Sequence, residues 1–361
     1  MAARTTQQVS QKRIAEAAGV SQPTVSLVLS GRYVISDDTR KRVLEAAETL
    51  KYRPNLLVRG MQTGKTRVIG VMAPPFDSFW SDVLYGIHDT LSVADHVPMM
   101  VWTTHEGRHR RKGPHPGPEH SLQQINRLLD RRIDGVILWP PFATYFHDHV
   151  NEFSSRDLPI VTIDHVLPPE FRSDCVSSDE QAGTSAVAKH LYDLGHRKFA
   201  HLSGHPNGTW AIDRRRFFEQ AIAATPDATC VSYQSRSEDD PTRIVPARTM
   251  LLSPDRPTAV FAATDILARK IYEAAAELKL RIPEDLSVVG FANNDFSAEM
   301  NPPLTTVRQM GYEIGSKAAQ IVLDRSNGVL TSRTPAHERM PVELIVRQST
   351  GPAPVQIEPI R

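Results

Sequence analysis

The stretch IAEAAGVSQPTVSLVL, residues 14–29, decides the fold of the N-terminal part of this 361-residue chain. Ile14 and Ala18 belong to one apolar helical face, and Gly19 permits a turn that few other residues could adopt. Ser21 is placed to cap a second helix beginning at Gln22–Pro23, where proline is tolerated because the first turn needs no hydrogen bond from its nitrogen. The pattern predicts two short helices joined by a tight turn.

The second of these helices has one face for packing and another for a partner. Val25, Val28 and Leu29 recur at helical spacing and are predicted to face inward. The side chains left for a partner are Ser21, Gln22, Pro23, Thr24, Ser26 and Leu27. In a helix-turn-helix the early residues of the second helix reach base edges in the major groove. Gln22 can bind adenine through two hydrogen bonds, and the nearby hydroxyls suit phosphates, so DNA contact is favoured over a plain helical hairpin.

Charge is distributed unevenly along the chain. Residues 1–66 contain eleven Lys or Arg and five Asp or Glu, a net charge of +6, whereas the remaining residues carry −5. A basic head on an acidic body indicates that the head meets a polyanion and that the body does not.

From Arg67 onward, short apolar runs alternate with helical patterns. The runs predicted as strands are 68–72, 135–138, 159–163, 199–202, 259–262 and 287–291. The main predicted helices are 80–94, 181–194, 212–224, 266–278 and 312–323. Such alternation is typical of parallel sheets covered by helices on both faces. This α/β region has about 280 residues, which is more than a single sheet with its covering helices usually contains. We therefore expect two α/β lobes with a cleft between them.

Four segments are therefore predicted. Residues 1–51 form an all-α helix-turn-helix head, whose third helix runs from about Asp37 to Leu50 with Ser36 as its cap. Residues 52–66 form a hinge helix and linker, and residues 67–350 form a two-lobed α/β domain for effector binding and dimerisation. The tail, 351–361, is short and contains proline, which disfavours a tetramerising coiled coil and predicts a homodimer.

Residues just past the predicted strands are the candidates for ligand binding, because open α/β sheets bind ligands at the carboxyl ends of their strands. The candidate effector-binding residues are Phe76, Asp77, Phe79, Trp80, Trp139, Asp164, Trp210, Arg214, Asp265 and Asn293. Aromatic rings can cover the C–H face of a sugar, and charged or amide groups can bind its hydroxyls. The alternatives are core packing for each aromatic residue and an interlobe ion pair for Arg214 and Asp265.

The chain resembles the lactose-repressor (LacI-type) family along nearly its whole length. The resemblance starts with IAEAAGVSQPTVSLVLSGR, SDDTRKRVLEAAETLKYRPN and TGKTRVIGVM. It continues through DGVILWPP, SSDEQAGTSAVAKHLYDLGHRKFAHLSG and PTAVFAATD to IPEDLSVVGF, PPLTTVRQMGYEIGSKAAQIVL and PVELIVRQST. It implies a repressor with a periplasmic-binding-protein-like body, in which a small ligand, commonly a sugar, controls affinity for a near-palindromic double-stranded operator.

The resemblance also implies a hinge helix, from about Asn55 to Gln62, that folds on DNA and inserts an apolar side chain into the minor groove. Asn55, Arg59 and Met61 would contact DNA, with Met61 where the family usually has leucine. Gly60 weakens this helix in isolation by about 1 kcal/mol relative to alanine.

Several positions depart from the family pattern. Leu27 stands where an arginine is common, so guanine readout there is replaced by apolar contact. Arg214 matches the family's effector-binding arginine, although Phe217 replaces the glycine that usually follows in its motif. Asp265 keeps a family carboxylate, whereas Ala292 and Asn293 replace two aspartates. The hydrogen-bonding pattern of the cleft therefore differs from that of relatives, and the sequence names neither the effector nor the direction of control.

No metal or cofactor is predicted. His105, His109 and His115 lie in a basic segment rich in Pro and Gly, interpreted as a solvated loop rather than a metal site. Cys175 and Cys230 have no metal-like spacing and are expected to be reduced thiols.

The N-terminus MAARTTQQVSQKR lacks the apolar core of a signal peptide, and no run approaches the roughly 20 apolar residues of a membrane span. A cytoplasmic protein without a membrane partner is expected. A sugar-binding transport protein would need an export signal and no DNA-binding head. An enzyme on an α/β fold is disfavoured because G-x-G-x-x-G after the first strand, a P-loop and G-x-S-x-G are all missing.

Overall fold

The computed structural model describes residues 10–30, 35–52, 64–74, 77–102, 118–140, 147–204, 206, 208–235, 244–332 and 334–355. It divides into two compact units, residues 1–66 and 67–361. We call them the head and the body.

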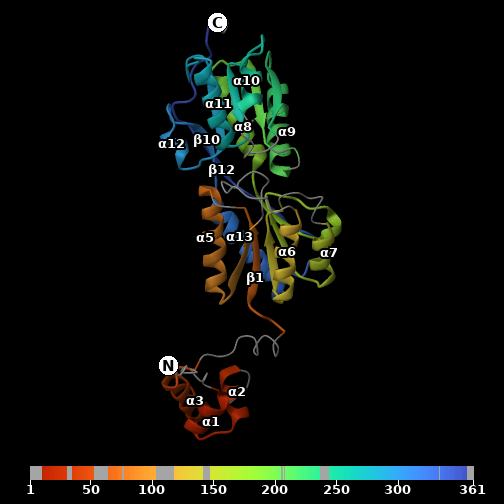
Figure 1. The fold of residues 1–361 in the computed structure, drawn as a ribbon, viewed down its shortest axis with the longest axis vertical. Helices are drawn as coiled ribbons and strands as arrows, with labels where there is room; N and C mark the ends of the chain where they lie inside the picture. Colours follow the sequence, from red (N-terminus) through yellow and green to blue (C-terminus); the bar gives the residue numbers. More distant parts are fainter. Residues whose placement is uncertain are drawn as a thin grey trace, which may run out of the picture. The chain divides into compact units, whose positions relative to one another are not determined.

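The head contains three helices, α1 (Gln11–Ala18), α2 (Gln22–Ser30) and α3 (Asp37–Thr49) (Figure 1). Gly19 ends α1 with φ +64°, in the left-handed region that favours glycine. Ile14, Val25 and Val43, one from each helix, are fully buried and form the centre of its core. The predicted helix-turn-helix and the third helix are thus confirmed.

Lobe 1 of the body has a parallel six-stranded sheet in the order β11-β5-β4-β3-β1-β2. The strands are β1 (Val68–Ala73), β2 (Val97–Trp102), β3 (Gly135–Leu138), β4 (Ile160–Ile163), β5 (Asp174–Ser178) and β11 (His337–Met340). Helices α5 (Ser78–Val93) and α13 (Gly311–Ser326) pack on one face. Helices α6 (Pro118–Asp130) and α7 (His147–Ser155) pack on the other, and a 3₁₀ turn, η2 (Pro169–Phe171), precedes β5.

Lobe 2 has a six-stranded sheet in the order β12-β10-β9-β8-β6-β7, parallel except for β12. Its strands are β6 (Lys198–Ser203), β7 (Thr229–Gln234), β8 (Ala259–Ala262), β9 (Ser287–Ala292), β10 (Thr305–Gln309) and β12 (Val342–Ile345). Helices α8 (Glu180–Asp193) and α9 (Thr209–Ala223) cover one face, and α10 (Ile244–Leu251) and α11 (Asp265–Glu277) the other. The short helix α12 (Phe296–Glu299) follows β9. The two predicted α/β lobes are confirmed.

The chain crosses between the lobes after β5, after β10 and after β11. Hydrogen bonds tie these crossings together. The Gln309 side-chain amide donates to Ser178 Oγ at 2.8 Å, and the Asp179 backbone N–H donates to the Met340 carbonyl at 2.8 Å. The three crossings therefore form one hydrogen-bonded hinge.

Two glycines let the lobe 1 helices α5 and α13 touch through their backbones. A Cβ atom on Gly315 would overlap the Val83 carbonyl oxygen, and one on Gly86 would overlap the Tyr312 carbonyl oxygen. Since α13 begins directly after the second crossing, this contact joins α5 firmly to the hinge.

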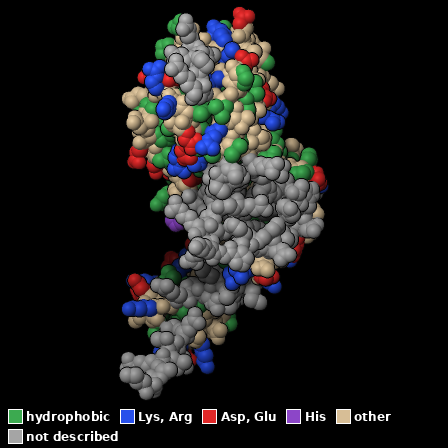
Figure 2. Space-filling model, turned by 45° about the horizontal axis from the view of Figure 1, so that its top comes forward, with side chains coloured by type: hydrophobic (Ala, Val, Ile, Leu, Met, Phe, Trp, Pro, Cys, Tyr) green, Lys and Arg blue, Asp and Glu red, His purple; other side chains and the backbone are tan. Residues whose placement is uncertain are grey.

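On the side that Figure 2 shows, the described Lys, Arg, Asp and Glu side chains of the body are interspersed. Within the described residues, no helix is long and apolar enough to cross a membrane. Cys175 and Cys230 are free thiols, as expected.

Candidate functional sites in the head and between the lobes

The second helix of the head presents the predicted DNA-contacting side chains on its outer side. Gln22 and Pro23 are exposed, and Thr24, Ser26 and Leu27 are half-buried. The Ser21 side chain caps α2: its Oγ accepts a hydrogen bond from the Thr24 N–H at 3.3 Å and lies 2.8 Å from Thr24 Oγ1. The first turn of α2 is therefore fixed by its own cap, with Gln22 left outward. Asn55, Arg59 and Met61 lie outside the described residues.

Asp164 lies directly after β4, where lobe 1 meets lobe 2. Its Oδ1 accepts a hydrogen bond from the Ser178 N–H at 3.3 Å, and its carbonyl accepts one from Thr209 Oγ1, on lobe 2, at 2.8 Å. The side chain is buried, and its pKa is raised to about 7, chiefly by burial and further by the Glu180 carboxylate, with Arg214 acting in the opposite direction. Asp164 is therefore poised between its two charge states near neutral pH.

Arg214 lies on α9 in a buried ion pair with Glu180, the first residue of α8. Its Nε donates to Glu180 Oε2 at 2.6 Å, its Nη2 donates to Oε1 at 2.9 Å, and its Nη1 donates to the Ala263 carbonyl at 2.7 Å. The guanidinium carbon lies 3.6 Å from the Phe291 ring centroid and 4.9 Å from that of Trp210. The arginine is thus held by a carboxylate, a carbonyl and two rings, all from lobe 2.

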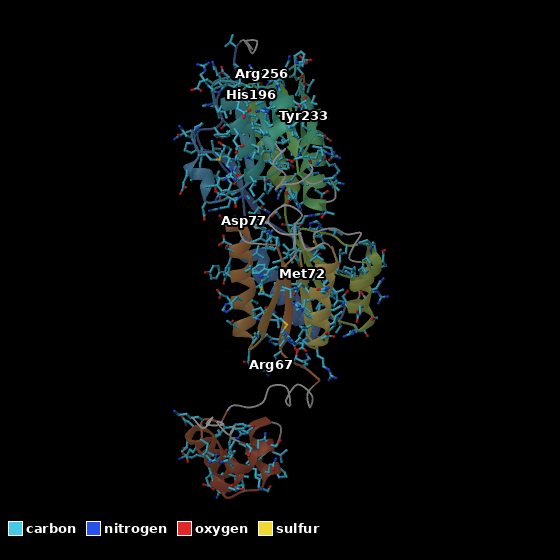
Figure 3. All side chains as sticks on the ribbon, viewed as in Figure 1. Arg67, Met72, Asp77, His196, Tyr233 and Arg256 are labelled. Atoms are coloured by element: carbon cyan, nitrogen blue, oxygen red, sulfur yellow. The ribbon has the colours of Figure 1, made fainter. Side chains whose placement is uncertain are left out.

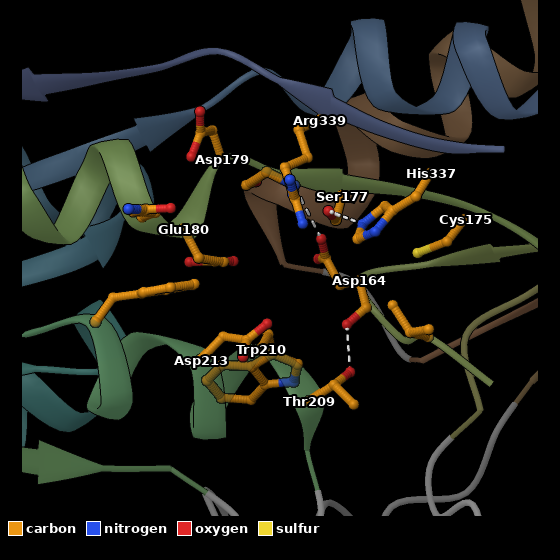
Figure 4. Close-up of a pocket in the computed structure, with 14 residues that line it drawn as sticks. Asp164, Cys175, Ser177, Asp179, Glu180, Thr209, Trp210, Asp213, His337 and Arg339 are labelled. Carbon is orange, nitrogen blue, oxygen red and sulfur yellow. Dashed lines mark hydrogen bonds between the residues drawn. The ribbon is translucent and has the colours of Figure 1, made fainter. Parts of the chain in front are cut away.

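A small polar pocket, with a cavity volume of about 30 Å³, lies beside these groups, where β4, β5 and β11 of lobe 1 face α8 and α9 of lobe 2 (Figure 4). Its lining consists of Asp164, Val166, Cys175, Ser177, Ser178, Asp179, Glu180, Gln181, Thr209, Trp210, Asp213, Phe217, His337 and Arg339. Ser177 Oγ and His337 Nε2 are 3.0 Å apart on its lobe 1 wall. Acceptors, hydroxyls and an indole ring thus surround one space between the lobes, and its lining has the chemistry that suits a polar ligand.

Two of the predicted effector-binding residues, Asp164 and Trp210, line this pocket, and Arg214 lies behind Glu180. Phe79, Trp80 and Trp139 are buried in the lobe 1 core, where edge-to-face contacts join Phe79 to Trp80 and Trp80 to Trp139. These three aromatic rings therefore pack in the interior of lobe 1.

The remaining predicted residues lie elsewhere. Asp77, labelled in Figure 3, caps α5 by accepting the Trp80 N–H at 2.9 Å. Asp265 is fully buried and accepts hydrogen bonds from Ser297, Thr306 and the Asn294 N–H at 2.6, 2.6 and 2.8 Å, and burial raises its pKa. Asn293 accepts a hydrogen bond from Arg347 at 2.7 Å. Asp265 is not ion-paired with Arg214, and Phe76 lies outside the described residues.

The sequence reasoning missed Asp179, Glu180, His337 and Arg339. Asp179 and Glu180 directly follow a strand, so the rule that identified Asp164 would have found them had β5 been predicted. His337 and Arg339 come from a strand that pairs with β5 from 162 residues further along the chain, and local sequence carries no signal for that pairing.

Comparisons with known proteins agree with this architecture. The family model described as bacterial regulatory proteins, lacI family, matches residues 12–55, and that of a periplasmic binding protein-like domain matches residues 188–350. The HTH-type transcriptional regulator DegA of Bacillus subtilis is 30% identical over 349 residues, covering 94% of this chain and 97% of DegA. The HTH-type transcriptional repressor PurR of Photobacterium profundum is 27% identical over 346 residues, covering 94% of this chain and 97% of PurR.

Among solved structures, the lac repressor dimer bound to operator and the anti-inducer ONPF matches with a TM-score of 0.77 at 24% identity, covering 96% of this chain and all of that one. This likeness supports the fold, and the extent of the DegA match establishes the relationship. The chain belongs to the lacI family of bacterial DNA-binding transcriptional repressors.

Proposed function

We propose that this repressor binds a near-palindromic operator as a homodimer in the cytoplasm and that a sugar in the pocket between the lobes releases it from DNA. The position of the pocket carries the proposal. It lies beside the hinge and is lined from both lobes, so a ligand there would bind one lobe arrangement better than another.

On the DNA side, Gln22 would read a base edge in the major groove, and Met61 of the hinge helix would enter the minor groove. Two copies related by a twofold axis would each read one half-site. The exposure of Gln22 and the capped first turn of α2 support this assignment.

On the ligand side, the Trp210 ring would pack on the C–H face of a sugar, while Asp164, Asp213 and Ser177 bind its hydroxyls. Because ligand and operator favour different lobe arrangements, each would weaken binding of the other by the same factor, about 5–150-fold.

The test starts by selecting the operator from fragmented genomic DNA with the purified full chain. Fluorescence anisotropy then measures affinity for that operator and for a scrambled duplex, with and without each member of a sugar panel. We expect a clear preference for the operator and loss of that preference with one sugar. A protein that binds all duplexes equally would contradict the proposal, and an operator affinity unchanged by every sugar would reject the effector assignment.

A further inference from the structure

The buried ion pair between Arg214 and Glu180 determines what charge the pocket can accept. An arginine carries five N–H donors in a planar fork, and a bound anion needs two of them side by side. Here the Nε and Nη2 side of the fork is occupied by both Glu180 oxygens, and Nη1 donates to the Ala263 carbonyl. The side chains of Arg214 and Glu180 are only 3% and 7% exposed, so solvent screens this contact weakly.

The rest of the pocket is also unfavourable for an anion. Four acidic side chains line it, from Asp164, Asp179, Glu180 and Asp213, of which Asp164 is only partly ionised near pH 7, and Arg339 is the one arginine in its described lining. Burial lowers the pKa of His337, so its imidazole is neutral at pH 7. Arg216 offsets Asp213 through an ion pair of 2.8 Å, but both of its partners are well exposed to solvent.

We propose that Glu180 is a specificity-determining residue that excludes anionic effectors, such as phosphorylated or acidic sugars, by neutralising Arg214 and holding its fork. The pocket then takes uncharged or cationic polar ligands. This inference rests on the proposed function, in which the pocket is the effector site, and it narrows the chemical class of the effector.

The mechanism is a competition for one guanidinium group. A phosphate or carboxylate that took Arg214 as its partner would have to displace Glu180. The buried Glu180 carboxylate would then lose its partner, and that loss costs more than the new contact contributes. A neutral ligand requires no displacement, because hydroxyls can bind Asp164, Asp213 and Ser177 while the ion pair stays intact.

The decisive variant is Glu180→Gln in the full chain, which keeps the shape of the side chain and removes its charge. Glu277→Gln is the matched control, since Glu277 also accepts a hydrogen bond from an arginine of lobe 2, Arg248, at 2.6 Å, but lies exposed on α11. Wild type and both variants are titrated with inorganic phosphate and with matched sets: glucose, glucosamine, glucose 6-phosphate and gluconate, and ribose with ribose 5-phosphate. The readouts are thermal shift and calorimetric affinity.

In wild type and Glu277→Gln, we expect glucose 6-phosphate and gluconate to bind no more tightly than glucose, and ribose 5-phosphate to bind no more tightly than ribose. Glu180→Gln should gain affinity for phosphate-bearing probes by about tenfold or more, since one nearby negative charge is removed. A wild-type preference for a sugar phosphate, or a folded Glu180→Gln variant as indifferent to anions as the control, would overturn the inference. Should Glu180→Gln fail to fold, the wild-type comparison of each anion with its parent decides.

The same titrations separate this inference from the proposed function. If no sugar binds wild type while Glu180→Gln gains phosphate binding, sugar is the wrong effector class but Glu180 still excludes anions. If a sugar binds and releases the operator while wild type also takes sugar phosphates, the proposed function stands and the role of Glu180 is rejected.

Discussion

Replacing Asp164 by asparagine should change how the stability of the body depends on pH. Asp164 is buried between the lobes, and its pKa rises from 3.8 to about 7 on folding. The substitution keeps an oxygen that can accept the Ser178 N–H and removes the titrating group. The variant therefore isolates the cost of burying this carboxylate.

The sign follows from the direction of the shift. A carboxyl group with a raised pKa in the folded state contributes stability below its unfolded pKa of 3.8, and that contribution is lost as pH rises through about 7. The rise in the pKa of Asp164 from 3.8 to about 7 corresponds to about 4 kcal/mol, because a tenfold change in an equilibrium constant is worth about 1.4 kcal/mol. Roughly 2–3 kcal/mol of this cost develops between pH 5 and pH 8.

The assay compares the Tm of wild type and Asp164→Asn at pH 5 and pH 8, following the transition of the body. We expect the Tm of the variant minus the Tm of wild type to be larger at pH 8 than at pH 5 by about 4–12 °C, since roughly 2–3 kcal/mol is worth about 2–4 °C per kcal/mol. Other groups, such as His196 with a pKa lowered to about 4 by burial, titrate in both proteins and cancel in the difference. Asp130→Asn, at an exposed carboxylate on α6, is the control. A Tm difference that does not change with pH would refute the reasoning.

Four further substitutions test the rest of the architecture. Gln22→Ala should weaken operator binding about 10–100-fold and leave Tm unchanged, because the side chain is exposed; equal affinity for operator and scrambled DNA in wild type would contradict this. Met61→Ala should lose much of the specific affinity in anisotropy measurements yet keep ligand binding, and an unchanged operator affinity would reject groove insertion. Ile14→Ala, at a fully buried site, should cost the head about 2–4 kcal/mol and abolish operator binding while calorimetry shows the body transition in place. Gly315→Ala should lower the Tm of the body strongly, because the new methyl group would overlap the Val83 carbonyl; a wild-type Tm would show that α5 and α13 can separate freely.

The elements with strong local signals were predictable from sequence. The turn at Gly19, the caps at Ser21 and Ser36, and the six apolar strands of the two sheet centres all appear where the pattern indicates. Each depends on interactions within a few residues or on a continuous buried run, which local reasoning captures.

Strands whose burial depends on distant partners were not predictable. β5 reads DCVSS, a polar stretch, yet every residue of it is buried because β4 pairs on one side and β11 on the other. β11 has the sequence HERM, and it belongs to the sheet because it pairs with β5. Since β5 leads directly into Asp179 and Glu180, missing it also hid the acidic wall of the pocket.

Arg214 shows why a motif match identifies a residue but not its chemistry. The sequence points to this arginine as a ligand contact, yet its first partner is Glu180, which lies 34 residues earlier on another helix. Glu180 follows Asp179, whose N–H is bonded to the Met340 carbonyl across two of the lobe crossings. Any ligand that pulled Arg214 away from Glu180 would therefore disturb the hinge itself, at the cost of an unpaired buried charge. A ligand that leaves the pair intact can instead act by contacting both lobes across the pocket. Glu180 would therefore select the charge of the ligand and also keep the hinge, on which release from DNA would depend, in its present arrangement.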